Sequence, residues 1–406
     1  MKNTYQTEDY FVSPWNYSED ISKQLNFKEK IKIHDVTLRD GEQQAGLVFR
    51  KDNKIRIAEM LAEAGVHRIE AGMPAVSDQD EAAIRDIAKR NLGDTEIFAF
   101  ARCMKDDVKL AADCGVKGII VEIPSSGHII EKAYQWPLEK AIELSIEATQ
   151  LAKELGLYTV FFPIDASRAD ITWFLDLIER VATEGHMDAL VAVDTFGGIS
   201  PHAVPFMMKQ IKERVNKPLE LHFHDDFELG VANTIMGLAH GAEVAHTTVA
   251  GIGERAGNAP YEALIMSLKT MYGVDTGIDT TKMYDIAKYI QEISGMPIRP
   301  NTPIIGDTLF EIESGIVTAW YKNVKDDAPL ELSPFLPKMV GQRPARPVLG
   351  KNSGIPSIEL YLTEIGKTLD EDRQMQLLRK VKQASFDKNR TITIDEFKEL
   401  VAAVEK

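Results

Sequence analysis

The segment IKIHDVTLRDG, residues 31–41, is a short apolar strand followed directly by polar residues, and this pattern decides the fold. It recurs along the chain, each time followed by an amphipathic helical stretch. The predicted strands are 31–36, 67–72, 96–101, 118–123, 158–163, 189–194, 219–224 and 244–251. The predicted helices are 52–65, 78–91, 105–114, 138–156, 170–184, 202–214, 228–240 and 260–272.

Eight strand–helix units within residues 31–275 predict an α/β fold, the closed (β/α)8 or TIM barrel, which needs roughly 250 residues. An open doubly wound sheet would rarely contain eight such regular units. In a barrel, catalytic groups lie at the carboxyl ends of the strands and in the loops that follow. We therefore expect functional side chains at those positions.

Polar residues gather where four of the predicted strands end. They are Arg39-Asp40-Gly41 after the first strand, Asp194-Thr195 after the sixth, His222 and His224 in the seventh, and Gly251 to Arg255 after the eighth. These positions are the ones at which a barrel carries its catalytic groups. The sequence thus predicts an active site at the barrel mouth.

The chain is expected to contain three regions. Residues 1–30 are predicted to form a polar N-terminal arm, and residues 31–275 the barrel. The regular alternation stops after residue 275, where a helix, a proline-rich connector and irregular sequence precede two further helices. Residues 276–406 are therefore predicted to form a smaller, mainly helical C-terminal subdomain with a lid or dimer role. Its predicted helices are 281–294, 369–386 and 394–405.

The composition limits the classes of function. The 406 residues include 47 Lys and Arg against 62 Asp and Glu, a formal net charge of −15, which disfavours nucleic acid and anionic membranes as partners. The N-terminal sequence has no apolar core of a secretory signal, and no segment is apolar for long enough to span a bilayer. Two cysteines fit a reducing compartment, so we expect a cytoplasmic protein.

His222 and His224 are candidate metal ligands. The two residues are two positions apart on a strand, so their side chains point to the same face, which can be the barrel interior. Asp40 can join them, because only the eighth strand separates the first from the seventh in a closed barrel. A carboxylate with two imidazoles suits Mg, Mn, Co or Zn and leaves positions open for water and substrate. A pair of hydrogen-bonded core histidines is the alternative.

The string HDVTLRDGEQQAG, residues 34–46, resembles the signature of metal-dependent lyase and synthase barrels. This family includes isopropylmalate, citramalate and homocitrate synthases and hydroxymethylglutaryl-CoA lyase. Supporting matches follow in order over residues 31–400. They are IEAGMPAVSDQD (69–80), VDTFGGISP (193–201), LHFHDDFELGVANT (221–234), GIGERAGNAP (251–260), ESGI (313–316) and LGKNSG (349–354).

The resemblance implies roles for individual residues. Asp40, His222 and His224 would bind a divalent metal, with Asn258 close to it. Arg39 would stabilise the oxygen that becomes negatively charged, and Thr195 would donate a hydrogen bond to a substrate carboxylate. A surface salt bridge for Arg39 and a strand-end cap for Thr195 are the structural alternatives. Gly251, Gly253 and Gly257 fit either a phosphate-binding loop or tight turns.

The chain departs from the synthases where they carry proton-transfer groups. Ile164 occupies the position of a glutamate, Ile312 and Val317 replace two histidines, and Leu330-Glu331 replaces a Tyr-Glu pair. Ala250 stands where the synthases have asparagine, as in the lyases. The acid–base groups are therefore expected elsewhere. Candidates are His128, Glu254, Tyr321 and Glu313, and Arg102 is a further candidate for substrate binding.

The resemblance favours a Claisen-type condensation of acetyl-CoA with a 2-oxo acid, giving a 2-hydroxy di- or tricarboxylate, in a homodimer. Oxaloacetate, 2-oxoglutarate, pyruvate and 2-oxoisovalerate all remain open as the acid. The alternative is a lyase or aldolase that cleaves a hydroxyacyl-CoA or a 4-hydroxy-2-oxo acid, which Ala250 favours. A non-catalytic metal-binding subunit is a third hypothesis, motivated by the missing proton-transfer groups.

Overall fold

The computed structural model describes residues 4–406, which form two compact units. The first unit contains residues 14–298, and the second contains residues 4–13 together with 299–406. This division differs from the predicted boundary after residue 275. Helix α11 (Met283–Ser294) belongs to the first unit because it packs against α2 (Lys51–Glu63), a tertiary contact that strand–helix alternation does not reveal.

Eight parallel strands close the first unit into a barrel in chain order, which confirms the predicted TIM barrel. Closure occurs between the first and last strands, with Lys32 in register with Val244. Residues 249–251 form a 3-10 turn, so the eighth strand is shorter than predicted. The strands are β1 (Lys32–Asp35), β2 (Arg68–Glu70), β3 (Glu96–Arg102), β4 (Gly118–Pro124), β5 (Tyr158–Ile164), β6 (Ala189–Asp194), β7 (Leu219–Phe223) and β8 (Val244–Thr247).

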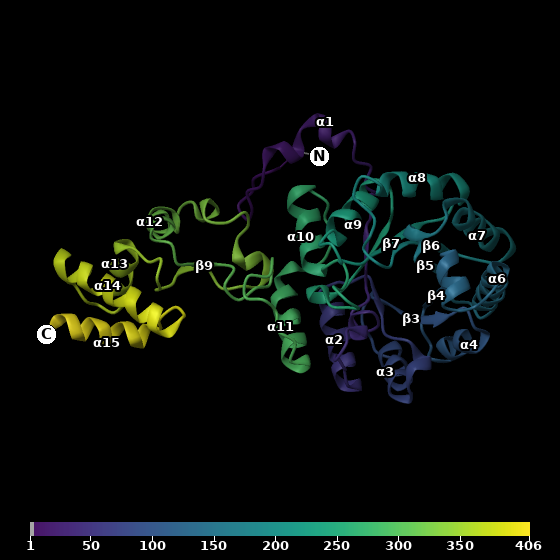
Figure 1. The fold of residues 1–406 in the computed structure, drawn as a ribbon, viewed down its shortest axis with the longest axis horizontal. Coiled ribbons are helices and arrows are strands. Elements are labelled where there is room, and N and C mark those ends of the chain that lie inside the picture. Colours follow the sequence, from purple (N-terminus) through teal and green to yellow (C-terminus); the bar gives the residue numbers. More distant parts are fainter. Residues whose placement is uncertain (1–3) are drawn as a thin grey trace. The chain divides into compact units, whose positions relative to one another are not determined.

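A helix follows each strand and covers the barrel from outside, as Figure 1 shows. Besides α2, these helices are α3 (Asp78–Ala88), α4 (Lys105–Asp113), α6 (Leu138–Glu154), α7 (Ile171–Glu184), α8 (Val204–Arg214), α9 (Gly230–Ala239) and α10 (Tyr261–Met271). The short α5 (Gly127–Lys132) between β4 and α6 was not predicted. It is too short to show a helical repeat in the sequence.

Side chains alternate along each strand between the helices and the barrel interior. Residues such as Ile33, Ile69 and Ile119 are buried on the outer face, beneath the helices. The interior is aromatic and charged: the ring of Phe98 packs edge-on against His34, and Arg68 lies over the same phenyl ring. Polar groups therefore line the barrel from its centre to its mouth.

The predicted N-terminal arm divides between the two units. Residues 4–13 join the second unit through hydrogen bonds from Phe11 N to Pro334 O (2.9 Å) and from Leu336 N to Asp9 O (2.8 Å). The residues from 14 onward, including α1 (Glu19–Ser22), belong to the barrel unit, where the Tyr17 hydroxyl donates to the carbonyl of Thr270. Residues 1–3 of the predicted arm lie outside the described range.

The second unit is mainly helical, as expected. Its apolar core joins the last three helices through buried side chains such as Leu362, Leu377 and Phe397. Helices α14 and α15 correspond to the two predicted terminal helices, whereas α12 and α13 were not predicted. The elements are β9 (Glu311–Ile312), α12 (Gly315–Val324), β10 (Arg346–Pro347), α13 (Ile355–Glu364), α14 (Glu371–Lys388) and α15 (Ile394–Glu405).

Within residues 4–406, no helix combines the length and the apolar character that crossing a bilayer requires.

Candidate active site

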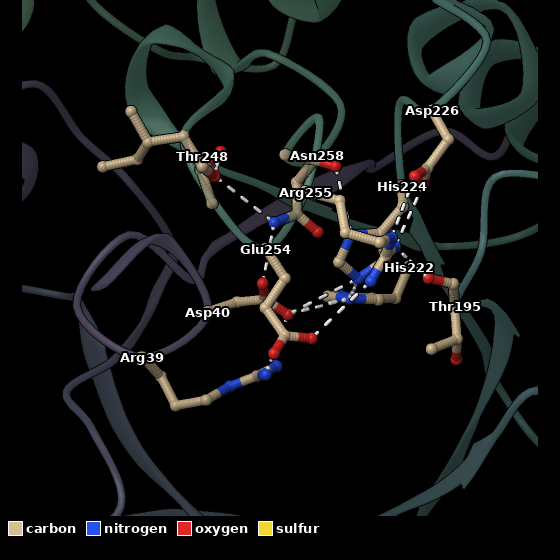
Figure 2. Close-up of polar contacts among 12 residues, drawn as sticks. Arg39, Asp40, Thr195, His222, His224, Asp226, Thr248, Glu254, Arg255 and Asn258 are labelled. Carbon is tan, nitrogen blue, oxygen red and sulfur yellow. Dashed lines mark hydrogen bonds and ion pairs between the residues drawn. The ribbon is translucent and has the colours of Figure 1, made fainter. Parts of the chain in front are cut away.

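Asp40, His222 and His224 converge at the carboxyl ends of the strands, as Figure 2 shows. The Asp40 Oδ2 atom lies 3.2 Å from His222 Nε2 and 3.8 Å from His224 Nε2. The two Nε2 atoms are 3.3 Å apart. All three residues are buried, so the three donor atoms face one another in a space that excludes bulk water.

Local structure explains this convergence. His222 lies in β7 and His224 directly follows it, so strand alternation turns both side chains the same way. Asp40 ends the turn after β1, and the pairing of β1 with β8 and of β8 with β7 brings it across to the histidines. The sequence prediction that these residues meet agrees with the geometry.

The protonation states suit metal binding. Burial lowers the pKa of His222 to about 3, although Asp40 acts in the opposite direction. Burial also lowers the pKa of His224. For Asp40, burial favours the acid, but Arg39 and His222 outweigh it and hold the pKa of this carboxyl well below its usual range. At neutral pH the site therefore presents a carboxylate and two neutral imidazoles, each with a lone pair to donate.

The donor atoms fit a divalent ion. In an octahedral site with bonds near 2.1 Å, neighbouring donors are roughly 3 Å apart, close to the separations at Asp40, His222 and His224. The Nδ1 atom of His224 lies 3.1 Å from the carbonyl of Gly257, an arrangement that commonly fixes the tautomer of a ligating histidine. The His222 Nδ1 and Asn258 Oδ1 atoms are buried without a hydrogen-bond partner in residues 4–406. His222 is therefore not a core histidine with all its hydrogen bonds satisfied.

Asn258 is also part of the cluster. Its side-chain amide nitrogen donates to Asp40 Oδ1 at 3.0 Å, and its own Oδ1 atom is buried with no donor among residues 4–406. The loop that carries it contains three glycines with positive φ. A Cβ atom at Gly257 would lie 1.8 Å from the carbonyl oxygen of Gly251, and one at Gly253 would lie 2.4 Å from the Asn258 amide. Tight turns thus account for Gly251, Gly253 and Gly257.

Arg39 is held beside the three donors by two carboxylates. Its Nη1 donates to Asp40 Oδ2 at 2.8 Å, and its Nε donates to the buried Glu70 of β2. The guanidinium carbon lies 4.1 Å from the centre of the Phe100 ring, a cation–π contact. Its Nη2 is buried without a partner in the described chain, which leaves a fixed donor for a ligand. A surface salt bridge, the structural alternative for Arg39, is therefore wrong.

Thr195 directly follows β6 at the same end of the barrel, next to the histidines in Figure 2. Its hydroxyl accepts a hydrogen bond from the backbone N–H of Asp165 (2.8 Å), and its carbonyl accepts one from Arg255. The hydroxyl proton has no acceptor among these contacts. Thr195 thus joins two loops, in keeping with the strand-end alternative, and still keeps a donor.

Arg102, His128 and Glu254 lie at the same end of the barrel but are more exposed. Their side chains are 49%, 44% and 53% exposed, respectively. Arg102 pairs with Asp107, His128 Nε2 lies 3.1 Å from Asp165 Oδ2, and Glu254 lies 3.6 Å from Arg255. Within residues 4–406, none of the three makes a hydrogen bond or ion pair with Asp40, His222 or His224.

Sequence reasoning missed two carboxylates that face the barrel interior, Glu70 in β2 and Glu122 in β4. Glu70 is buried and holds Arg39, which lowers the pKa of Glu70 to about 2 against the opposing effect of burial. The available signal was a single acidic residue inside an apolar strand, in HRIEAG and GIIVEI. A buried charge in such a place requires a partner or a function.

A second group of possible ligands lies deeper in the barrel, formed by His34, Glu220 and His246. Glu220 already accepts hydrogen bonds from Arg68 at 2.7 Å and is 2.9 Å from His246 Nε2. Arg68 thus neutralises Glu220, as Arg39 neutralises Glu70. An added dication would leave this layer with an uncompensated buried charge.

We therefore expect one tightly bound divalent ion per chain, held by the site at the mouth. Elemental analysis after dialysis against Mn²⁺ or Zn²⁺ should give about one equivalent. The ion should be lost in His222→Ala and retained in His246→Gln, the matched control from the deeper layer. Two equivalents in the natural chain, falling to one in His246→Gln, would contradict this prediction.

The turn after β8 is held by a buried carboxyl. Glu262 in α10 accepts hydrogen bonds from the backbone N–H of Ala250 (3.0 Å to each oxygen), and Ala250 has a φ of 56°. Burial raises the pKa of Glu262 to about 8, and the nearby Asp35 contributes in the same direction. The folded protein therefore favours the protonated acid. This preference makes folding less favourable as the pH rises from the ordinary pKa of glutamate to about 8.

Glu262→Gln should keep an acceptor for Ala250 and remove this pH dependence. Each pKa unit corresponds to about 1.4 kcal/mol. When the pH is raised from 6 to 9, we therefore expect the free energy of unfolding of the variant to increase by a few kcal/mol relative to that of the natural chain. Urea unfolding at both pH values measures the effect. Glu143→Gln, at an exposed position of α6, is the control and should show no such gain. Equal pH slopes for the Glu262 variant and the natural chain would contradict the prediction.

Taken together, the fold and the donor atoms define a TIM-barrel protein with a candidate divalent-metal site at the carboxyl ends of its strands. The sequence model of the HMGL-like family matches residues 30–290, and the chain belongs to this family. Homocitrate synthase AksA from Methanothermobacter thermautotrophicus is 35% identical to it over 97% of this chain and 98% of that protein. A probable 2-isopropylmalate synthase from Ignicoccus hospitalis is 38% identical over 93% of each chain.

Solved structures support the fold. The HMG-CoA lyase of Bacillus subtilis superposes with a TM-score of 0.61, covering 68% of this chain and 97% of that one, at 22% identity. At this level of identity the likeness establishes the barrel alone.

Proposed function

We propose that this protein is a divalent-metal-dependent acyltransferase that condenses acetyl-CoA with a 2-oxo acid to give a 2-hydroxy di- or tricarboxylate. The observation that carries the proposal is the convergence of Asp40, His222 and His224 beside the unpartnered Nη2 of the buried Arg39. Relatives that match nearly the whole chain are named as synthases. The sequence resemblance implies the same reaction.

Asp40, His222 and His224 would hold the ion, and Asn258 would join them through its Oδ1 atom, which is buried without a hydrogen-bond partner in residues 4–406. Mg, Mn, Zn and Co all suit one carboxylate with two imidazoles. When bound, such an ion acts as a Lewis acid that polarises the keto group of the acid. The neutral histidines and the ionised Asp40 are ready to bind it without a prior change of protonation.

Arg39 and Thr195 would bind and orient the 2-oxo acid. The free Nη2 of Arg39 would donate to the oxygen on which negative charge develops, and the guanidinium is already fixed by Asp40, Glu70 and Phe100. Preorganised donors of this kind stabilise a transition state without reorganisation. The Thr195 hydroxyl would donate its proton to the carboxylate of the substrate.

The residues at the rim have more peripheral proposed roles. Arg102, half-exposed at the end of β3, would attract the anionic substrate. His128 and Glu254 remain proposed proton-transfer groups for hydrolysis of the thioester, which consumes water and releases CoA as a thiol. Within residues 4–406, neither makes a hydrogen bond or ion pair with the three metal-binding candidates, so we assign both to this later step.

The runner-up reaction is metal-dependent cleavage of a carbon–carbon bond by a lyase or aldolase. Its support in this chain is Ala250, at a position where the sequence resemblance leads one to expect alanine in the lyases and asparagine in the synthases. The backbone N–H of Ala250 donates to the carboxyl of Glu262. This feature concerns the turn behind the site and leaves the arrangement of Asp40, His222 and His224 unaffected.

We further propose that the protein works in the cytoplasm as a homodimer. Ile316 and Trp320, one turn apart on α12, are 70% and 54% exposed, which provides an apolar surface for association. Analytical ultracentrifugation at micromolar concentration should show a dimer that Trp320→Glu weakens. A monomer at all concentrations would remove this part of the proposal.

The decisive experiment is an assay of free-thiol release from acetyl-CoA with Mg²⁺ or Mn²⁺. It compares oxaloacetate, 2-oxoglutarate, pyruvate and 2-oxoisovalerate, with Asp40→Asn as the inactive control. Rapid release with one acid, absent in the control, would establish the reaction and its substrate together. Failure with every acid in a metal-loaded protein would reject the condensation. Pyruvate formation from 4-hydroxy-2-oxo acids would then test cleavage.

A further inference from the structure

Glu122 occupies an inward-facing position near the mouth of the barrel. In the strand register it lies opposite Arg102 of β3 and Phe162 of β5. The Phe162 ring packs edge-on against His222, with ring centres 5.0 Å apart, and against Phe100, on which Arg39 rests. Glu122 therefore belongs to the set of side chains that surrounds Arg39 and the candidate metal ligands.

The carboxylate of Glu122 is incompletely satisfied. Its Oε2 atom is buried and has no hydrogen-bond partner in residues 4–406. The Nη2 atom of Arg39 is likewise buried and has no hydrogen-bond partner in these residues. Buried polar atoms are rarely left without partners, because each one costs about 1–3 kcal/mol. An unpaired acceptor and an unpaired donor on two residues that interact electrostatically indicate that a ligand with both kinds of group binds there.

The charges around Glu122 come from several elements. Burial is the largest influence and raises the pKa of Glu122 to about 7, while Arg39 and Arg102 oppose it and Asp107 adds to it. Tyr134 and Cys103 are the other titratable groups on which Glu122 acts, and burial raises the pKa of both. Near neutral pH, the carboxyl of Glu122 is therefore able both to take up and to release a proton.

We propose that Glu122 is the general base of the reaction, taking a proton from the methyl group of the acetyl thioester. The inference rests on the proposed function. The electron pair of the broken C–H bond forms the enolate, whose carbon then bonds to the keto carbon of the 2-oxo acid. The proton on Glu122 returns to the oxygen of the former keto group, so the carboxylate is regenerated. Hydrolysis of the thioester then consumes one water and releases the thiol.

The other candidates for this step are less well placed. His128 and Glu254 are about half-exposed and engaged by Asp165 and Arg255. Ile164, the position at which the sequence resemblance leads one to expect a glutamate, is paired in register with Pro124. Glu122 thus lies one inward-facing position deeper, on the adjacent strand. A carboxylate in β4 would replace the one that β5 lacks.

The test compares Glu122→Gln with the natural chain in the thiol-release assay. The amide has the same shape but cannot accept the proton, so we expect kcat to fall by about 10²- to 10⁴-fold. Bound metal, measured by elemental analysis, should be unchanged. In the natural chain kcat/KM should rise with pH through about 7, because the ionised base is the active form, and this rise should be absent from the residual activity of the variant.

A second variant and a matched control make the test independent of folding defects. Glu122→Asp keeps the charge but withdraws the carboxylate by one methylene, and we expect at least tenfold lower kcat with the pH-dependent rise retained. Glu96→Gln, at the opposite end of β3, is the control and should keep its activity.

The outcomes separate this inference from the proposed function. Suppose that the natural chain is active with one 2-oxo acid. The role of Glu122 alone would then be overturned if its variants keep more than a third of kcat, or if kcat/KM of Glu122→Gln rises with pH as it does in the natural chain. A natural chain inactive with every acid would overturn both.

Discussion

Replacing Asp40 with asparagine should abolish metal binding and reduce thiol release by about 10³-fold or more. Asp40 is the single anion among the three candidate ligands, and it also accepts hydrogen bonds from Arg39 and Asn258. Without it, two neutral imidazoles would have to hold a dication beside the fixed positive charge of Arg39. Lewis-acid stabilisation worth several kcal/mol would be lost, which corresponds to this change in rate.

Elemental analysis and the thiol assay, performed on the same preparation, measure the two effects of Asp40→Asn together. Asp52→Asn in the exposed first turn of α2 is the matched control and should behave like the natural chain. A variant that keeps its full metal content and at least half of the activity would exclude Asp40 as a ligand. Circular dichroism should confirm that the barrel remains folded.

Arg39→Lys should lower kcat by about 10²- to 10³-fold while leaving the metal bound. The guanidinium divides its donors between Glu70, Asp40 and the open site, and its flat face rests on Phe100. A lysine ammonium retains the charge but cannot reproduce this planar arrangement of donors. The fixed donor that faces the substrate would be lost, whereas Asp40 and both histidines would remain.

Comparing kcat with metal content distinguishes the two possible roles of Arg39. If metal and activity decline in parallel, Arg39 serves mainly to hold Asp40, and its proposed part in the transition state is refuted. Arg85→Lys, in the ion pair between Arg85 and Glu81 on α3, tests the same substitution far from the barrel mouth. It should change neither quantity.

The sequence was sufficient to predict the barrel and the grouping of its best ligands. Strand alternation places His222 and His224 on one face, and closure between β1 and β8 brings Asp40 to them. Both inferences rely on local periodicity and on the topology of a known fold. Residues whose role follows from such rules can be identified before a structure exists.

Other features depended on tertiary contacts that periodicity does not encode. The hydrogen bond between Glu70 and Arg39, and the position of Glu122 from which we propose its role, depend on how β2 and β4 pack around Arg39. The unit boundary lies after residue 298 because α11 packs on α2, far away in sequence. The 3-10 turn that shortens β8 depends on Ala250 adopting a positive φ, which the sequence around an alanine does not announce.

The assignment of residues 4–13 to the second unit has a consequence for biosynthesis. These residues are translated before the barrel, whereas the segments that they bind, around Pro334 and Leu336, are translated after it. The contacts of residues 4–13 with these segments therefore form only after the barrel has been translated. For the same reason the second unit cannot be produced as one uninterrupted fragment. A stand-alone version would need residues 4–13 rejoined to residue 299 through a new linker.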